Sequence, residues 1–559
     1  MRPSSRQDAG SLVANNAEWS SYMRNVLTIA WVRATIGPVK QALRPPGADM
    51  SHDEPLAVTV ANVRHLAPDG TPPPDAPDWI WQYDHPYLHG AFAPTNVEYD
   101  CEDLEVEGEI PADLCGAYVM NGPSQRFEPV NEKYHYYDGD AMLRAIYFRD
   151  GRASFRQKWL RNGAFVVEDM AKKAIWPGLA GPFDFRLPGS PIKDVSNTDI
   201  IFYNGNFLSL WYMAGDPYKV DPLTLETVGR ETLGGALSHS VSAHSKTDPW
   251  TGELFFFNYQ DEPPYMSYGM ADANGRLKFD IPVKLDGPRS PHDMGLTENY
   301  AILHDLPFYH DVEILKKHKR RVMGFHRDQP ARFGLIDRYG RSDHVQWFEC
   351  EPCYVLHISN SWEDGDWVHM HGCRQEDPMP VKDPADHHLA SMMAYRRRTH
   401  VMYRWSFNTK TGAVREGMVD DANTEFPTVN ANFLGRKSRY SFNQLIPAPA
   451  NGSLEGRCQT FNGLLRYDLE TGATQRYEYG EGVYGSEAPV APSSRADRES
   501  GEAKAYPVSF ITDSNDWSSA CLIFDAEDIT KPIAKVKIPR RISIGFHTTW
   551  VDGKHIWPS

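Results

Sequence analysis

The sequence is short of basic residues and has no long hydrophobic run. Its 559 residues contain 58 lysines and arginines against 74 aspartates and glutamates, a formal net charge of −16. Nonspecific affinity for nucleic acid or anionic lipid depends on excess positive charge, so both partners are disfavoured, whereas a neutral or cationic small substrate suits this balance. Because no stretch of about twenty apolar residues is present, we expect no membrane-spanning helix.

Cysteines are also few, and no secretory signal peptide opens the chain. The seven cysteines form an odd set, which predicts reduced thiols and a cytoplasmic compartment. Only Cys350 and Cys353 have the spacing of a metal-binding pair, with Cys373 downstream, and a structural zinc site needs a second pair. We therefore interpret these three cysteines as buried and reduced.

The first 78 residues differ from the rest and are predicted to form an N-terminal extension. Residues 1–21 are polar, the pattern of Tyr22–Lys40 predicts a helix with one apolar face, and residues 44–78 form a proline-rich linker. The helix has two interpretations. Either it packs on the protein's own surface, or it touches a membrane through which an apolar substrate enters, which would make the protein peripherally membrane-associated.

Residues 79–559 repeat one pattern, a run of β-branched and aromatic residues followed by a turn pair and another such run. The turn pairs are Asp150-Gly151, Asn204-Gly205, Thr251-Gly252, Asn274-Gly275, Thr411-Gly412, Thr471-Gly472 and Asp552-Gly553. Hairpins in series over nearly the whole region, without alternating helices, predict an all-β propeller of four-stranded blades. No WD or kelch repeat is present, so the pattern leaves the number of blades open.

Four of the 21 histidines stand in short polar or turn-like segments beside predicted strands: His244, His292, His357 and His547. The innermost strands of a propeller all line its central axis, so residues distant in sequence can meet there. Four neutral imidazoles would leave the full charge of a divalent ion uncompensated and, in octahedral coordination, two positions free. If the four histidines converge, the pattern predicts an all-imidazole metal site, and iron(II) with open positions would make such a site a centre for oxygen chemistry.

At these segments the chain resembles the carotenoid cleavage oxygenase family of nonhaem iron enzymes. The likeness rests on Leu104–Pro111 (LEVEGEIP), Asn121-Gly122-Pro123, Tyr134–Met142 (YHYYDGDAM) and the four histidine segments. It covers roughly four-fifths of the chain, and separated motifs in one order rarely coincide by chance. The resemblance implies a seven-bladed propeller at residues 79–559, capped by a helical and loop dome, and one Fe²⁺ bound by His244, His292, His357 and His547.

The resemblance also implies which carboxylates orient the histidines. A metal-bound imidazole needs its other ring N–H held, and Glu425 and Glu487 occupy motifs where the family places such glutamates. A third glutamate of many relatives falls at Tyr212 or Met213, and neither is acidic. One histidine is therefore expected to be oriented by another group, such as a backbone carbonyl or a water.

Further positions bear on the substrate and oxygen pocket. Thr198 matches a threonine that lies beside the metal in many relatives, and Trp211 stands where phenol-cleaving relatives carry a lysine, which favours an apolar polyene over a phenolic stilbene. A hydrocarbon must be positioned by pocket shape, so tunnel residues are expected to be aromatic. The aromatic candidates near the motifs are Phe127, Trp211, Phe308, Tyr309 and Trp362.

The predicted function is an iron(II) dioxygenase that splits a conjugated C=C bond of a carotenoid, apocarotenoid or stilbene-like arylalkene. Its partners are then O₂ and a small apolar alkene, with no nucleic acid and with transient membrane contact for substrate uptake. No nicotinamide or flavin motif is evident, and the alkene supplies the electrons. Two alternatives stay open: an isomerase or isomerohydrolase of retinoid type on the same iron site, and a propeller that only binds.

Overall fold

The computed structural model describes residues 73–557 with several gaps. The residues left out of this range are 74, 84, 86, 132, 188–189, 342, 380–381, 383, 385–389, 391–393, 395–397 and 448–459. The predicted helix at Tyr22–Lys40 and most of the proline-rich linker lie outside the described residues. The described part belongs to one compact unit, Val63–Ser559, and no helix in it is long and apolar enough to cross a membrane.

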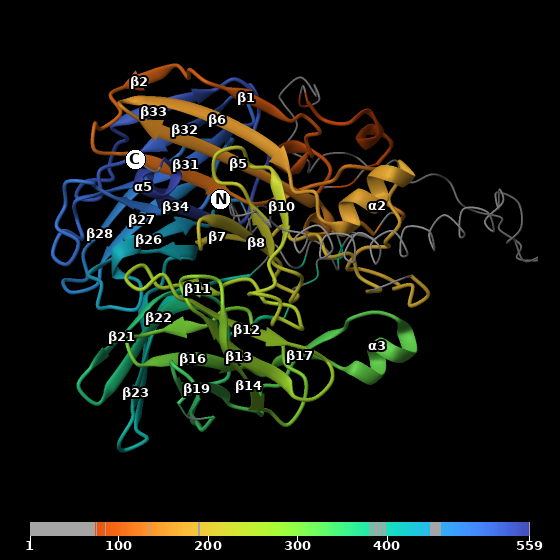
Figure 1. The fold of residues 1–559 in the computed structure, drawn as a ribbon, viewed down its shortest axis with the longest axis vertical. Helices are drawn as coiled ribbons and strands as arrows, with labels where there is room; N and C mark the ends of the chain where they lie inside the picture. Colours follow the sequence, from red (N-terminus) through yellow and green to blue (C-terminus); the bar gives the residue numbers. More distant parts are fainter. Residues whose placement is uncertain are drawn as a thin grey trace, which may run out of the picture. The chain divides into compact units, whose positions relative to one another are not determined.

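Seven antiparallel sheets form the blades of a propeller, as the resemblance implied (Figure 1). The blade that holds both ends of the described chain has the order β1 (Tyr99–Cys101), β6 (Arg152–Trp159), β5 (Asp140–Arg149), β3 (Gly116–Met120) and β34 (Thr548–Asp552), with β4 (Pro123–Ser124) beside β5. The next blade consists of β7 (Asp199–Tyr203), β8 (Asn206–Leu210), β9 (Tyr218–Val220) and β10 (Thr227–Arg230).

Three further blades follow in chain order. The third is built from β11 (Lys246–Thr247), β12 (Leu254–Tyr259), β13 (Tyr265–Ala271) and β14 (Leu277–Lys284). The fourth is built from β15 (Gly295–Leu296), β16 (Tyr300–Asp305), β19 (Ala331–Asp337) and β20 (Val345–Cys350). The fifth is built from β21 (Tyr354–Asp364), β22 (Trp367–Gln375), β23 (Val401–Asn408) and β24 (Val414–Asp420).

The last two blades complete the ring. The sixth is built from β25 (Thr424–Thr428), β26 (Tyr440–Leu445), β27 (Gly463–Asp468) and β28 (Thr474–Glu478). The seventh has the order β2 (Val106–Gly108), β33 (Ala534–Ile538), β32 (Ser519–Ile523), β31 (Ala505–Asp513) and β29 (Val483–Gly485), with β30 (Val490–Pro492) beside β31. N-terminal strands therefore complete two C-terminal blades: β3 pairs with β34, and β2 pairs with β33.

Six of the seven predicted turn pairs connect neighbouring strands of one blade; the prediction is wrong for Asp552-Gly553, where Asp552 ends β34 and Gly553 begins the helix α5 (Gly553–Ile556). Asp150-Gly151 joins β5 to β6 and Asn204-Gly205 joins β7 to β8, with Arg149 facing Arg152 and Tyr203 facing Asn206 in the two registers. All four turn residues have positive φ angles, between 46° and 75°. Two successive positive φ values produce the turn whose twist matches paired strands, and asparagine, aspartate and glycine tolerate them best.

Helices and short insertions lie between or beside the strands of the blades. The described α-helices are α2 (Gly163–Ala171), α3 (Val312–His318) and α5 (Gly553–Ile556). The described 3-10 turns are η1 (Asp78–Gln82), η2 (Gly90–Phe92), η3 (Tyr136–Asp138) and η6 (Ala431–Phe433). A separate two-stranded sheet pairs β17 (Phe308–His310) with β18 (Met323–Phe325). Figure 1 shows α2 and α3 projecting on the same side of the blades. One buried cluster joins η1, η2 and η3 to Phe426, Phe461 and Phe546, and so caps the end of the propeller axis.

Packing between blades supplies the core. Phe148, Phe510 and Trp550 belong to one cluster between the first and seventh blades, and Phe333, Trp405 and Phe407 to another between the fourth and fifth. Each fully buried side chain of this size stabilises the fold by roughly 1.5–3 kcal/mol. The innermost strands touch around the axis, β34 with β7, β7 with β11, β15 with β21, β21 with β25, and β30 with β34.

Candidate metal centre

The four predicted histidines lie within an innermost strand or up to three residues before one. His244 precedes β11, His292 precedes β15, His357 lies in β21 and His547 directly precedes β34. Since these strands converge on the axis, four chain segments that are up to 303 positions apart deliver one imidazole each to the same place. The pairing of β21 with β22 contains a bulge between Val355 and Ile358. Because a bulge changes the direction of the side chains next to it, it redirects the His357 side chain.

The four rings form a compact group. Ring centroids lie 4.5 Å apart for His244–His547 and His357–His547, 4.9 Å for His244–His357, and 4.8 and 5.1 Å from His292 to His244 and His357. One potential ligand atom from each of His244, His357 and His547 lies within 4.8 Å of the others. Two nitrogens bound to one ion at about 2.1 Å are at most about 4.2 Å apart, so only small ring movements separate this trio from a coordination geometry.

The donor atoms fit a metal. The Nε2 atoms of His244 and His357 are buried and have no hydrogen-bond partner among the described residues. A buried polar atom without a partner is costly, and a cation that accepts both lone pairs removes that cost. Neutral imidazoles suit iron, zinc, copper and nickel, so the donor set alone does not choose among them.

Two carboxylates orient two of the rings, as expected for Glu425 and Glu487. His357 Nδ1–H donates to Glu425 Oε2 at 2.6 Å, and His547 Nδ1–H donates to Glu487 Oε1 at 3.1 Å. The other oxygen of Glu487 accepts from the backbone N–H and the hydroxyl of Thr548. These bonds place the Nδ1 proton on the outer side of each ring and direct Nε2 inward.

The other two histidines are held differently. The Tyr212 ring lies beside the His292 ring, with centroids 5.8 Å apart, and no carboxylate of the described chain hydrogen-bonds the His292 imidazole. An aromatic ring thus stands at the position where the sequence lacks an acidic residue. The His244 backbone, rather than its ring, is the part that is held. Its backbone N–H donates to Asp199 Oδ2 at 2.9 Å, and its φ angle is +63°. A non-glycine residue in this region costs about 1–3 kcal/mol, so the surrounding contacts enforce the conformation.

Burial sets the charge state of the rings. It lowers the pKa of His244, His292 and His357 well below the usual histidine range, and the neighbouring imidazoles lower the pKa values of all three further. Burial also lowers the pKa of His547, but the Glu487 carboxylate outweighs it and the net shift is upward. Burial raises the pKa of Glu425 to about 7. Three rings are therefore neutral at physiological pH, the form that binds a metal.

An apolar cavity opens on one side of the centre. The residues that line it are Tyr137, Thr198, Tyr212, His292, Leu356, His357, Glu425, Phe426, Ile446, Phe461, Phe546 and His547. Phe426 stacks on His547, with centroids 4.3 Å apart and planes at 13°, and also contacts His357 at 4.8 Å. Its φ of +51° turns the chain directly after Glu425.

Several cavity residues were not among the sequence candidates. Leu356, Phe426 and Phe546 each adjoin a predicted ligand or orienting glutamate, and Tyr137 lies in the motif at residues 134–142, so adjacency to the motifs was the available signal. Ile446 and Phe461 carry no such signal, because they reach the cavity only through the path of the sixth blade.

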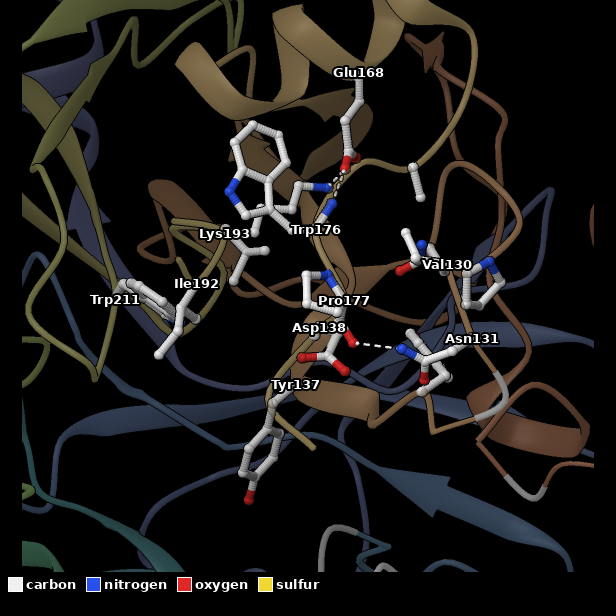
Figure 2. A pocket seen from close by; sticks show the side chains of 16 residues that line it. Val130, Asn131, Tyr137, Asp138, Glu168, Trp176, Pro177, Ile192, Lys193 and Trp211 are labelled. Carbon is white, nitrogen blue, oxygen red and sulfur yellow. Dashed lines mark hydrogen bonds and ion pairs between the residues drawn. The ribbon is translucent and has the colours of Figure 1, made fainter. Parts of the chain in front are cut away.

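The predicted pocket residues fall in different places. Thr198 lines the cavity, and its carbonyl accepts the His547 backbone N–H at 3.1 Å. Trp211 lies at the edge of a neighbouring pocket that shares Tyr137 with the cavity; Figure 2 shows it there, with the buried Lys193–Glu168 ion pair at another edge.

The other aromatic candidates do not line the cavity at the histidines. Phe308 packs against Tyr354 in the core of the fourth and fifth blades, and Phe127 lies under the Arg126 guanidinium. Tyr309 stacks on His326, and Trp362 packs on His369 and His371. Closeness in sequence to a motif did not bring these rings to the cavity: Phe308 and Tyr309 lie on β17, outside the blades, and Trp362 lies near the far end of β21.

Replacing Glu425 or Glu487 by glutamine should weaken metal binding. The amide leaves the ring in place but holds the Nδ1 proton less strongly, so we expect metal affinity to fall on the order of 10- to 100-fold, measured by competition with a coloured chelator. Glu363→Gln is the matched control, because Glu363 accepts from Thr297 and Asn299, away from the histidines. Affinity equal to the parent in both variants would show that neither carboxylate supports the centre.

Comparison with known proteins agrees with the geometry. The model of the retinal pigment epithelial membrane protein family matches residues 92–552. A carotenoid 9,10(9',10')-cleavage dioxygenase of Crocus sativus is 31% identical over 84% of this chain and 90% of its own length, and an isoeugenol monooxygenase of Pseudomonas nitroreducens is 28% identical over 83% and 98%.

A solved structure shows the same architecture. Lignostilbene dioxygenase of Pseudomonas brassicacearum superposes with a TM-score of 0.75 at 25% identity, covering 84% of this chain and 99% of that one. The chain therefore shares the overall fold of a known enzyme. The chain belongs to the carotenoid oxygenase family that the retinal pigment epithelial membrane protein model describes, and it is an oxidoreductase that incorporates O₂.

Proposed function

We propose that the protein is an iron(II) dioxygenase that cleaves a conjugated C=C bond of an apolar alkene, a carotenoid, apocarotenoid or stilbene-like arylalkene, to two carbonyl products. The observation that carries the proposal is the group of four imidazoles, two with unpartnered buried Nε2 atoms, at the wall of an apolar cavity. His244, His292, His357 and His547 would hold one Fe²⁺ per chain. Family membership favours iron over the other metals that this donor set suits.

The residues around the centre have separable tasks. When bound, iron supplies a site that activates O₂ beside the alkene, and both oxygen atoms end in the products, so the electrons come from the double bond itself. Glu425 and Glu487 fix the His357 and His547 rings. Phe426, Phe461 and Phe546 exclude water and hold a hydrocarbon by shape, because it offers no groups for hydrogen bonding.

The cavity favours a polyene over a phenolic stilbene. Apart from the metal-binding group, its lining is dominated by Leu356, Ile446 and aromatic rings, and no lysine is among the lining residues. Trp211, at the position of the lysine in phenol-cleaving relatives, lies in the adjoining pocket. Trp211 therefore adds apolar surface to the path beyond Tyr137 rather than a cation that would engage a phenol.

Two other functions fit parts of the same arrangement. An isomerase of retinoid type would use the same four histidines without splitting the alkene, and a propeller that only binds would need no metal. The apolar cavity meeting the imidazoles favours oxidative cleavage, since it lets a double bond and O₂ lie side by side at one ion. Product analysis and metal analysis separate the three.

We propose further that the protein contacts a membrane transiently at the corner formed by α3 and residues 181–187. Phe183 N–H donates to the Lys319 carbonyl at 2.8 Å, which joins the two segments. Phe185, Ile314 and Val322 expose 51%, 36% and 50% of their surface there. Lys317, Lys319 and Arg320 are exposed beside them and form no ion pair within the described chain. Apolar side chains flanked by unpaired cations suit an anionic bilayer, despite the overall charge of −16.

Cleavage of a polyene under ¹⁸O₂ should place label in both aldehyde products. We expect strong cleavage of a carotenoid or apocarotenoid and weaker turnover of a phenolic stilbene, read by mass spectrometry of the products, because the cavity positions hydrocarbons by shape. An unlabelled isomer as the only product would instead establish isomerisation, and unchanged substrate in the presence of bound iron would leave only binding.

Replacing a ligand should remove the metal and leave the fold. His292→Ala is the cleaner change, because no carboxylate of the described chain loses a partner, and His357→Ala tests a ring held by Glu425. Both variants should lose most bound iron and all cleavage while keeping the parent circular dichroism spectrum. His369→Ala is the control, since His369 is buried on β22 and bonds Ser406 of the adjacent strand β23 rather than an orienting glutamate. Full iron content in His292→Ala would exclude His292 from the site.

Charge reversal at the corner should abolish vesicle binding. Each cation near an anionic surface contributes about 1 kcal/mol, so K317E/K319E/R320E should lower partitioning onto phosphatidylserine-containing vesicles on the order of 100-fold or more at low salt. Binding to phosphatidylcholine alone should be weak for parent and variant, in a flotation assay. R495E/K504E/K531E is the charge-matched control, since these cations belong to the seventh blade, are exposed and form no ion pair within the described chain. Equal losses in both triple variants would exclude a specific corner.

A further inference from the structure

The histidine group has a second face that differs in chemistry from the apolar cavity. His244, His357 and His547 line a channel whose wall is formed by residues of the innermost strands β7, β11, β21, β25, β30 and β34, so the channel follows the propeller axis. Its lining extends to Asn204, Thr251 and Lys554, which are exposed on the surface. Two imidazoles, His357 and His547, therefore border both spaces.

The channel wall next to the histidines is polar and carries net negative charge. Asp199, Asp293 and Glu487 line it together with Lys246, whose Nζ pairs with Asp293 Oδ1 at 2.7 Å. Ser245, Ser359 and Thr548 add hydroxyl groups to this wall. Three carboxylates against one paired ammonium make the inner channel favourable for a cation.

The apolar cavity and the axial channel differ in the kind of molecule that can move through them. A divalent ion in water is strongly hydrated, and its transfer into apolar surroundings costs tens of kcal/mol. The cavity is lined mainly by apolar and aromatic side chains such as Phe426, Phe461 and Phe546, and its one carboxylate, Glu425, is already bonded to His357, so it offers little to replace that hydration. A channel with carboxylates and hydroxyls lets the ion keep its water until imidazoles replace it. An alkene has the opposite preference.

We propose that the axial channel is the route by which the metal reaches and leaves the four histidines, while alkene and O₂ use the apolar cavity. This inference rests on the proposed metal-dependent function of the same site. It follows that metal exchange does not require the substrate cavity to be open. The carboxylates Asp199 and Asp293 then guide the ion along the last part of the path, where they line the channel and accept the backbone N–H groups of His244 and Ile358.

The route predicts that a positive charge inside the channel slows metal exchange. Thr549, on β34, lines the channel, is half-buried and binds neither histidine nor orienting glutamate. We would introduce Thr549→Cys and modify the thiol with a methanethiosulfonate reagent bearing a trimethylammonium group or, separately, a sulfonate group. Iron loss to a soluble chelator from the loaded full chain should slow on the order of 10-fold with the cation and change little with the anion. Reduction of the label should restore the original rate.

Controls separate the channel from general effects of labelling. Thr411→Cys, on the exposed hairpin between β23 and β24, carries the same labels away from the axis and reports any contribution of the native cysteines. An unreactive alkene analogue that fills the apolar cavity should leave the rate of iron loss unchanged. Slower loss with the analogue, or an unchanged rate with the cationic label at Thr549, overturns the proposed route.

The failure of this proposal is distinguishable from failure of the proposed function. A chain that binds iron and cleaves a polyene, yet exchanges metal at the same rate with every label, overturns the channel route alone. A chain that binds no ferrous ion in any state overturns both. Co²⁺ in place of Fe²⁺ gives a second readout of exchange through its visible absorption, which does not depend on turnover.

Discussion

Closure of the propeller ring is the constraint on which the metal centre depends. The last strand of the described chain, β34, pairs with β3 from the N-terminal side, with Met120 opposite Thr548 and Gly116 opposite Asp552. His547 directly precedes β34, and its backbone N–H is tied to Thr198 at the start of the next blade. If this pairing slipped by one residue, every side chain of β34 would change faces and His547 would leave the axis.

The four imidazoles are not held equivalently. Carboxylates hold His357 and His547, a strained backbone and Asp199 hold His244, and a tyrosine ring packs against His292. A charged partner fixes both the tautomer and the direction of a ring, whereas aromatic packing restricts only its position. The His292 ring therefore has no carboxylate that fixes its direction, and it faces the apolar cavity in which the alkene would lie.

The centre also separates two environments. An apolar cavity ends at His292, His357 and His547, and a polar axial channel ends at His244, His357 and His547. Placing the imidazoles between them gives a hydrocarbon and a hydrated cation separate access to one point. The cap formed by η1, η2 and η3 with Phe426, Phe461 and Phe546 keeps solvent from the cavity side.

The sequence by itself determined the local and chemical parts of this protein. Positive-φ pairs such as Asn204-Gly205 specify their hairpins through backbone sterics, and the segments around the four histidines, Glu425 and Glu487 carried the metal chemistry through a family resemblance. Only the tertiary structure decided that Ile446 and Phe461 line the cavity, that Phe127 and Phe308 do not, and that a polar channel reaches the centre from the other face. The reason is physical: turns and ligand types depend on neighbouring residues, whereas the walls of a cavity depend on how seven blades close around an axis, which no local pattern encodes.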